Sequence, residues 1–275
     1  MKECEMFSSL KVPCGSKILL RLDGRGFYNL SKQIGLKKPY DPLFLDAMVN
    51  TATEIFKEFS PSFIYTFSDE FNILLADIPF AGRIEKLNSV FASFTANSFY
   101  SNLIKNKLSP RISQSSENNN NNNNNNINKE TIIGDLEIEK IFKTLKTISF
   151  DCRVIPLSSE MVSEYFKGRQ DEAWRNCLNG YVYWTLRDEM AKEEAMKILK
   201  GLKADKIHDI LFERGINIAE VPSWQRRGVG IYKVDKMVNG YNPLSKESTT
   251  SSRRVIKVDF DLPRFDNEFF HNFIE

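Results

Sequence analysis

The chain has 275 residues, with 38 Lys or Arg against 36 Asp or Glu, so that its formal net charge is +2. Hydrophobic residues make up 41% of it, which is the balance of an ordinary globular protein that can bury a core without disulfides or metals. The near-neutral charge excludes a wholly basic, histone-like nucleic-acid binder, although it allows a basic patch on one face.

The cysteines and histidines limit the kinds of covalent, metal and catalytic site that the chain can form. The four cysteines show no paired spacing that would indicate a disulfide framework or a zinc site, and with only two histidines, His-based catalysis is not favoured. No apolar run approaches the roughly 20 residues of a membrane span, and the acidic N-terminus does not resemble a targeting peptide. We therefore expect a cytoplasmic protein, with the nucleus as the alternative, that has no membrane partner.

The first ~107 residues show the pattern strand, helix, strand, strand, helix. Strands are predicted at residues 18–23, 63–67 and 71–75. The first helix is predicted to start at Asp41-Pro42, because Asp caps a helix and Pro suits its first turn, and the second to follow Gly82. A fourth strand near residues 150–155 would complete a βαββαβ unit, which is the ferredoxin-like arrangement.

The remainder of the chain divides into an insertion and a C-terminal part. A polar stretch at about residues 109–129, which contains an unbroken run of Asn, is expected to be a disordered insertion within a core of residues 1–155. Residues 156–275 are predicted to be mainly helical up to about Gly215, with strands at 229–234 and 254–260 and a last helix at 263–273. We expect an α+β fold whose C-terminal α/β extension packs on the core as one structural unit.

Two aspartates are the first candidates for chemistry. Asp23 ends a buried strand and Asp69 lies at a hairpin tip, and the first and third elements of a βαββαβ sheet are neighbours, so that the two carboxylates can converge. Two carboxylates without a counter-ion repel each other, whereas a divalent cation between them relieves the repulsion. Mg²⁺ prefers a few carboxylates with water and substrate phosphates. The alternative is a pair of turn-forming aspartates without a ligand.

Basic and Gly-rich segments near these aspartates suit a phosphate ligand. Gly24 and Gly26 flank Arg25 and allow close approach of the backbone to a ligand. Arg83 and Lys86 lie three residues apart near a helix N-terminus, where both can face one anion. Lys38 is a further candidate clamp. A solvated basic surface is the alternative for each of these cations.

Together these segments resemble a known family. The matching segments, in family order, are Arg21-Leu22-Asp23-Gly24-Arg25-Gly26-Phe27, Lys38-Pro39-Tyr40-Asp41, Ser68-Asp69-Glu70, Arg83-Ile84-Glu85-Lys86, Phe150-Asp151-Cys152-Arg153 and Ala204-Asp205-Lys206. The chain resembles, over roughly residues 6–235, the tRNA(His) guanylyltransferase family and its guanylyltransferase-like relatives, the 3′-to-5′ RNA polymerases.

The resemblance implies a polymerase-palm catalytic core that works with two Mg²⁺ ions and with ATP, GTP and other nucleoside triphosphates. Asp23, Asp69 and the backbone carbonyl of Gly24 match the metal ligands, and Glu70 matches a neighbouring acidic residue that is placed with the catalytic group. The positions implied in nucleotide binding are Asp23, Gly24, Arg25, Gly26, Phe27, Tyr28, Lys38, Ser68 and Asp69. Those implied in binding a triphosphate or the activated RNA 5′ end are Arg83, Lys86 and Lys206. The family also suggests a homotetramer.

One departure from the family affects the predicted substrate. Enzymes that add G at position −1 of tRNA(His) carry a His-Ile-Asn-Asn motif, where this chain has Trp174-Arg175-Asn176-Cys177. We therefore expect template-dependent addition to the 5′ end of tRNA, as repair or editing, through an adenylylated or triphosphorylated 5′ end. Addition of G at position −1 is the alternative within the family.

A non-catalytic RNA- or nucleotide-binding palm module is the alternative from another class, and the intact aspartate pair argues against it. Trp174 is interpreted as a helix-packing residue, with base stacking as the alternative. RNA binding is expected at Arg226 and Arg227, because a basic pair beside Trp224 suits contacts to phosphate and base. A strand-edge charge cluster is the alternative there.

Overall fold

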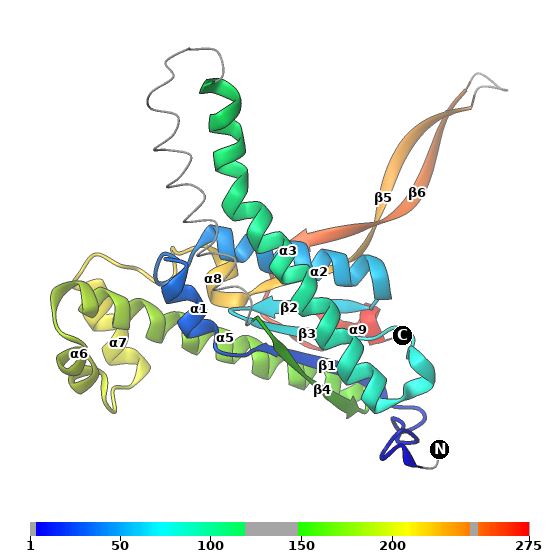
Figure 1. Cartoon of the computed structure of the whole chain (residues 1–275), viewed down its shortest axis with the longest axis horizontal. Helices are drawn as coiled ribbons and strands as arrows, with labels where there is room; N and C mark the ends of the chain where they lie inside the picture. The colour runs from blue at the N-terminus through cyan, green and yellow to red at the C-terminus, as the bar shows by residue number, and fades with distance from the viewer. Residues whose placement is uncertain (1–3, 119–147, 243–246, 275) are drawn as a thin grey trace.

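The computed structural model describes residues 4–118, 148–242 and 247–274. In this part of the chain one antiparallel sheet has the strand order β4-β1-β3-β2-β5-β6 (Figure 1). The strands are β1 (Lys17–Gly24), β2 (Phe63–Phe67), β3 (Glu70–Leu74), β4 (Phe150–Leu157), β5 (Val229–Asn242) and β6 (Glu247–Asp259). The helices are α1 (Phe27–Gln33), α2 (Pro42–Phe59), α3 (Ile84–Asn118), α5 (Ser159–Glu189), α6 (Lys192–Leu199), α7 (Ala204–Phe212), α8 (Ser223–Arg227) and α9 (Asn267–Ile274). The predicted α+β class is confirmed.

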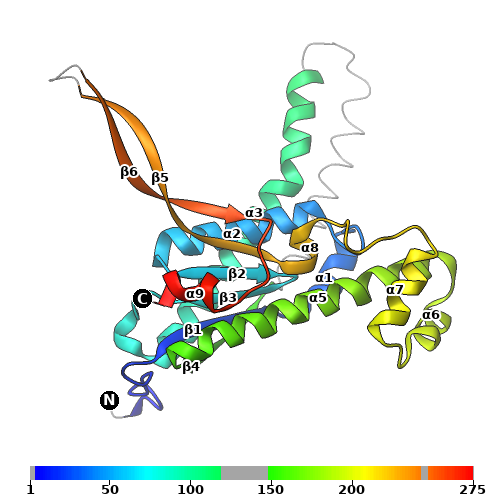
Figure 2. The same ribbon diagram turned by 180° about the vertical axis from the view of Figure 1, so that it is seen from behind.

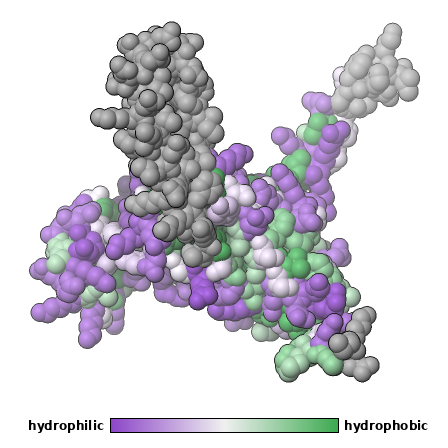
Figure 3. All heavy atoms as spheres, viewed as in Figure 1, coloured by the Kyte–Doolittle hydropathy of each residue, from purple (hydrophilic) through white to green (hydrophobic). Residues whose placement is uncertain are grey.

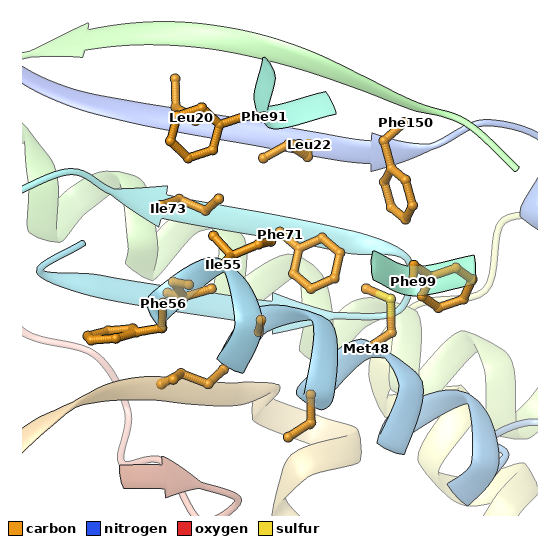
Figure 4. Packing of buried hydrophobic residues seen from close by; sticks show 14 of the residues in the cluster. Leu20, Leu22, Met48, Ile55, Phe56, Phe71, Ile73, Phe91, Phe99 and Phe150 are labelled. Atoms are coloured by element: carbon orange, nitrogen blue, oxygen red, sulfur yellow. The ribbon is translucent and has the colours of Figure 1, made fainter. Parts of the chain in front are cut away.

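Helices α2 and α3 cover one face of the sheet. Alternate side chains of β1 and β3 point to this face, as the two-residue period of a strand requires, and they meet the apolar sides of both helices (Figure 4). The labelled members of this core are Leu20, Leu22, Met48, Ile55, Phe56, Phe71, Ile73, Phe91, Phe99 and Phe150. Helix α2 is capped by Asp41, whose side chain accepts a hydrogen bond from the Leu43 amide at 2.8 Å. The helix start predicted at Asp41-Pro42 is therefore confirmed.

The opposite face is covered by α5 and α9 (Figure 2). Its core is rich in aromatic rings, with Phe63 of β2 in contact with Phe166 of α5 and with Phe270 of α9. Gln170 of α5 fixes the chain before α9, since its side chain donates to the Pro263 carbonyl and accepts from the Phe265 amide. The C-terminal segment is thereby tied to the sheet.

Helices α6 and α7 pack against the far half of α5. Their shared core includes Leu178, Val182 and Leu186 of α5 with Ile207 and Leu211 of α7. In the view of Figure 3 this arm is largely hydrophilic, whereas hydrophobic residues are more frequent toward the right of the same view. No helix in the described ranges has the length and apolar character that crossing a membrane requires.

The structure also departs from the predicted elements. Helix α1 was not predicted, and α9 begins at Asn267 rather than at residue 263. Strands β5 and β6 are longer than predicted and project beyond the sheet as a two-stranded ribbon (Figures 1 and 2).

Helix α3 continues to Asn118, so that the first part of the segment expected to be disordered is helical. Once started, a helix gains one hydrogen bond for each residue added, even where the sequence is polar. Residues 119–129 of the predicted insertion lie outside the described residues.

Candidate active site

The structure brings Asp23 and Asp69 together at one end of the sheet. Asp23 is the penultimate residue of β1, and Asp69 lies in the two-residue turn between β2 and β3. The Gly24 amide donates a hydrogen bond to the Asp69 carbonyl oxygen at 3.0 Å, which joins the strand end to the turn. Ser68 has a left-handed φ of 50°, a conformation that costs a non-Gly residue about 1–2 kcal/mol. Its Oγ donates to Asp69 Oδ1 at 2.9 Å.

Negative charge is concentrated at this turn. Burial raises the pKa of the Asp69 carboxyl, and the nearby carboxylates of Asp23 and Glu70 raise it further, while the hydrogen bond from Ser68 opposes the shift. No group of three or more His, Cys, Asp or Glu side chains arranged to hold a metal occurs among the described residues. A cation here would therefore have two carboxylates, with backbone oxygen, water or substrate phosphate as its remaining ligands.

The Gly-rich segment after Asp23 has a steric requirement at Gly24. A Cβ at this position would lie 2.5 Å from the ring of Phe27, so that a larger residue would displace the ring. Gly26 has a φ of 73° and precedes α1, and the Arg25 amide donates to the Ser149 carbonyl at 2.9 Å. Phe27 is buried in the core between Phe99 and Phe150, whereas Tyr28 is 63% exposed.

A cavity of about 440 Å³ is lined by Asp69 of the aspartate pair, whereas Asp23, Gly24, Arg25 and Gly26 are not among its lining residues. Five of the residues predicted to bind nucleotide line it, namely Phe27, Tyr28, Lys38, Ser68 and Asp69. Its lining also includes Tyr40, Asn176, Asn179 and Trp224, which the sequence analysis did not assign to nucleotide binding. Asn176 and Asn179 are three residues apart on α5 and therefore lie on the same side of that helix. This spacing is the one signal in the sequence that could have predicted that they line the same cavity.

Lys38 presents its ammonium group at the cavity wall. Its Nζ donates to Ser31 Oγ at 2.7 Å and lies 5.7 Å from the ring centre of Trp184. Partial desolvation of the ammonium lowers the pKa of Lys38, and the carboxylate of Asp41 opposes this only in part. An anionic ligand would raise the pKa of Lys38 again and favour its charged form, which suits a phosphate-binding lysine.

Glu70 follows Asp69 directly but has a different environment. It is 7% exposed, and its carboxylate receives two hydrogen bonds from Arg169 of α5, at 2.7 and 2.5 Å. The Asn72 side chain donates to the same carboxylate at 2.7 Å. Both oxygens of Glu70 thus accept hydrogen bonds from protein groups, and its place in the catalytic group stays a prediction.

Arg83 and Lys86 are not brought to the aspartates of the same chain. They lie at the start of α3. There the backbone of Arg83 forms an isolated β-bridge with that of Lys11, and the Val12 amide donates a hydrogen bond to the Gly82 carbonyl. Lys11 and Val12 belong to the segment just before β1. Strand β1 extends about 20 Å from this end of the sheet to Asp23. Since β3 runs away from the turn before α3 starts, Arg83 and Lys86 lie at the other end of the sheet from Asp23, and their role in binding a triphosphate or the activated 5′ end stays a prediction.

The remaining predicted cations lie outside the cavity lining. Lys206 is exposed on α7 and pairs with Asp209 at 3.1 Å. Arg226 donates to the Val221 carbonyl at 3.1 Å and Arg227 to the Leu262 carbonyl at 3.0 Å, so that both are half-buried supports of α8 beside Trp224. Their role in RNA binding stays a prediction.

Trp174 is a helix-packing residue, as the sequence analysis interpreted it. It is half-buried in the core that α5 shares with α6 and α7, and its ring lies 6.0 Å from that of His208.

These features define an α+β protein with two carboxylates close together at one end of an antiparallel sheet, and comparison with known proteins identifies the family. The family model described as tRNAHis guanylyltransferase matches residues 1–158, and the model described as the Thg1 C terminal domain matches residues 160–260. The chain therefore belongs to the tRNAHis guanylyltransferase family, which is a family of nucleotidyltransferases.

Relatives match along most of the chain. A probable tRNA(His) guanylyltransferase of Dictyostelium discoideum is 26% identical, covering 92% of this chain and 88% of the relative. The tRNA(His) guanylyltransferase of Debaryomyces hansenii is 28% identical, covering 92% of this chain and 85% of the relative.

Solved structures share the fold. A bacterial tRNA(His) guanylyltransferase-like protein in complex with ATP has a TM-score of 0.69 at 22% identity, covering all of this chain and 97% of the other. The Saccharomyces cerevisiae tRNA(His) guanylyltransferase has a TM-score of 0.63 at 21% identity, covering 80% of this chain and 87% of the other.

Proposed function

We propose that this nucleotidyltransferase adds nucleotides in the 3′-to-5′ direction to the 5′ end of tRNA, directed by the opposite strand, as 5′-end repair or editing. The observation that carries the proposal is the convergence of Asp23 and Asp69 beside a cavity of about 440 Å³ with Lys38 in its wall. The strand order β4-β1-β3-β2, with α2 and α3 on one face, supports a ferredoxin-like polymerase palm as the catalytic core.

The donors at the aspartate pair fit Mg²⁺. Two carboxylates and the backbone carbonyl of Gly24 are hard oxygen ligands, and the pKa of Asp69 is raised by burial and by the nearby carboxylates of Asp23 and Glu70, which a cation would offset. When bound there, two Mg²⁺ ions would favour deprotonation of the attacking hydroxyl and neutralise the leaving group. Asp23, Gly24 and Asp69 are the residues that would hold them.

The protein groups orient the reactants. The cavity admits a nucleoside triphosphate, with Lys38 and the turn at Ser68 toward its phosphates and the aromatic wall at Tyr28 and Trp224 toward its base. The nucleotide 3′-oxygen attacks the activated 5′ phosphorus of the RNA. A new P–O bond forms, the hydroxyl proton leaves, and pyrophosphate or AMP departs. ATP, GTP and the other nucleoside triphosphates are the proposed substrates.

Template-dependent addition is favoured over addition of G at position −1 by the segment at Trp174. The family's His is replaced there by a Trp that packs against α7 and is not presented to the cavity. The names of the relatives favour the alternative, so we keep it as the second candidate.

The test supplies a tRNA that lacks its first 5′ nucleotide and carries a 5′-triphosphate, together with Mg²⁺ and the four nucleoside triphosphates. We expect only the nucleotide complementary to the opposite strand to be added, and changing that opposite base should change the nucleotide. Addition of a single G whatever the opposite base would instead establish the alternative, and no addition by folded protein would refute both.

The proposed roles of Arg83, Lys86 and Lys206 depend on how several copies of the chain assemble. We propose that the chain forms the homotetramer suggested by its family, and that a neighbouring chain supplies the cations that bind the activated 5′ end. We also propose that residues 1–155 and 156–275 act as one unit, since α5 packs across the sheet that carries the aspartates.

A further inference from the structure

Arg169 of α5 contacts the hairpin that carries Asp69 at both residues that flank its turn, Phe67 and Glu70. Its Nε and Nη2 atoms donate to the two carboxylate oxygens of Glu70 at 2.7 and 2.5 Å, in the bidentate geometry that suits a guanidinium. The two side chains are 14% and 9% exposed, and they are 99 residues apart in the sequence. This is a buried ion pair between distant segments.

The same guanidinium contacts the other side of the turn. Its Cζ lies 5.3 Å from the ring centre of Phe67, which is the last residue of β2, whereas Glu70 is the first residue of β3. Arg169 therefore contacts both residues that flank Ser68-Asp69. Because Ser68 is held in the left-handed region, the turn needs support from outside the hairpin to keep its conformation.

Further hydrogen bonds extend the contact between Arg169 and Glu70 on both sides of the ion pair. Asn72 donates to Glu70 and accepts a hydrogen bond from the hydroxyl of Tyr165 at 2.7 Å, one turn before Arg169 on α5. Glu172 accepts from Arg169 Nη1 at 2.9 Å. Across the sheet, Asp23 is the register partner of Glu70. The guanidinium thus places a fixed positive charge one residue from Asp69 and beside the strand that carries Asp23.

We propose that Arg169 is a positioning residue for nucleotidyl transfer. It holds the β2–β3 turn through Glu70 and Phe67 so that Asp69 and Asp23 keep the spacing that a divalent cation requires. The inference rests on the proposed function, and it assigns Glu70 to the support of the site rather than to contact with the substrate.

The decisive variant is Arg169→Lys, which keeps the charge but loses the bidentate fork and the planar contact with Phe67. Binding of Mn²⁺, measured by electron paramagnetic resonance without RNA or nucleotide, should weaken about ten- to hundredfold, the range expected when a group that orients a metal ligand is changed. The kcat at saturating Mg²⁺ should fall, while the KM for the nucleoside triphosphate stays within about twofold of its original value.

The matched control is Arg214→Lys. Arg214 also forms a bidentate pair with a glutamate of α5, donating to Glu189 at 2.8 and 3.0 Å, but at the far end of that helix. We expect this variant to bind Mn²⁺ and to extend tRNA as the original chain does. Equal Mn²⁺ affinity in Arg169→Lys and Arg214→Lys would overturn the inference.

A double variant separates positioning from simple stability. Arg169→Met alone leaves the charge of Glu70 buried, so that the melting temperature should fall, whereas Arg169→Met/Glu70→Gln removes both charges and should recover it. If the pair positions the turn, the double variant melts like the original chain but still binds Mn²⁺ weakly. Recovery of both properties would show that the pair serves stability alone.

The two proposals can fail separately. An original chain that neither binds Mn²⁺ nor extends tRNA refutes the proposed function. One that does both, alongside an Arg169→Lys variant that equals it, refutes only the role of Arg169.

Discussion

The amide of Gly24 donates a hydrogen bond to the carbonyl oxygen of Asp69 at 3.0 Å. It links a strand end to a turn 45 positions later, and the side chains of Asp23 and Asp69 flank it. The ring of Phe27 fills the space that a side chain at position 24 would need, so this link between strand and turn requires glycine.

The change Gly24→Ala should therefore disturb both stability and activity. Its Cβ would lie 2.5 Å from the Phe27 ring, and overpacking of this kind costs about 1–3 kcal/mol. We expect a lower free energy of unfolding in urea and a loss of tRNA extension. Gly168→Ala on α5, where a Cβ meets nothing within 4 Å, is the control. Equal behaviour of the two variants would contradict the close packing at Gly24.

Replacing Asp69 by Asn should separate activity from stability. We expect Asp69→Asn to abolish extension but, without divalent cations, to raise the free energy of unfolding at pH 7. The pKa of Asp69 is raised in the folded chain, so its ionised form disfavours folding and stability falls as pH rises from about 4 towards that raised pKa. The gain should vanish at low pH, where the carboxyl is protonated in both states.

The measurement is urea unfolding from pH 3.5 to 7 with and without Mg²⁺. Mg²⁺ should stabilise the original chain but not the variant, because a ligand of the native state stabilises that state. Asp46→Asn, on the exposed side of α2, is the control and should not respond to Mg²⁺ differently from the original chain. A stabilisation of Asp69→Asn by Mg²⁺ equal to that of the original chain would exclude Asp69 as a ligand.

The change Trp174→Ala should affect stability and not nucleotide binding. The half-buried ring packs against α7, and its loss should lower the free energy of unfolding by about 2–3 kcal/mol. Trp224, which lines the cavity, gives the contrast, and Trp224→Ala should raise the KM for the nucleoside triphosphate. Reduced tRNA affinity of Trp174→Ala at unchanged stability would instead support base stacking.

Arg83 gives a test of assembly. If a neighbouring chain supplies it, Arg83→Ala and Asp23→Ala should each be inactive, and mixed assemblies of the two should recover part of the activity, because some sites then combine an intact Arg83 with an intact Asp23. The readout is tRNA extension after the two proteins are unfolded and refolded together. Mixtures that remain inactive would contradict a site shared between chains.

Local signals predicted the elements that surround the site. The Asp-Pro pair at 41 and 42 marked the start of α2, and two short apolar runs around Ser68-Asp69 marked the hairpin. The length of β5 and β6 could not be predicted, because the projecting ribbon has no buried face to impose alternation, as Asp235 and Lys236 illustrate.

Contacts between segments that are far apart in the sequence could not be predicted either. Nothing in the sequence near Glu70 indicates that Arg169 reaches it, and the cavity wall at Asn176 exists only because α5 lies across the sheet. The place of Arg83 and Lys86 in the fold could not be predicted for a related reason. Residue type indicated an anion site, whereas the direction of β3 decided which end of the sheet they occupy.

Helix α5 has 31 residues and is about 46 Å long. About a third of the way along this helix, Arg169 contacts Glu70 beside the turn that carries Asp69. Asn176 and Asn179 line the cavity, and Leu186, near the end of the helix, packs in the core shared with α6 and α7. One continuous helix thus connects the turn that carries Asp69, the wall of the cavity and the arm formed by α6 and α7.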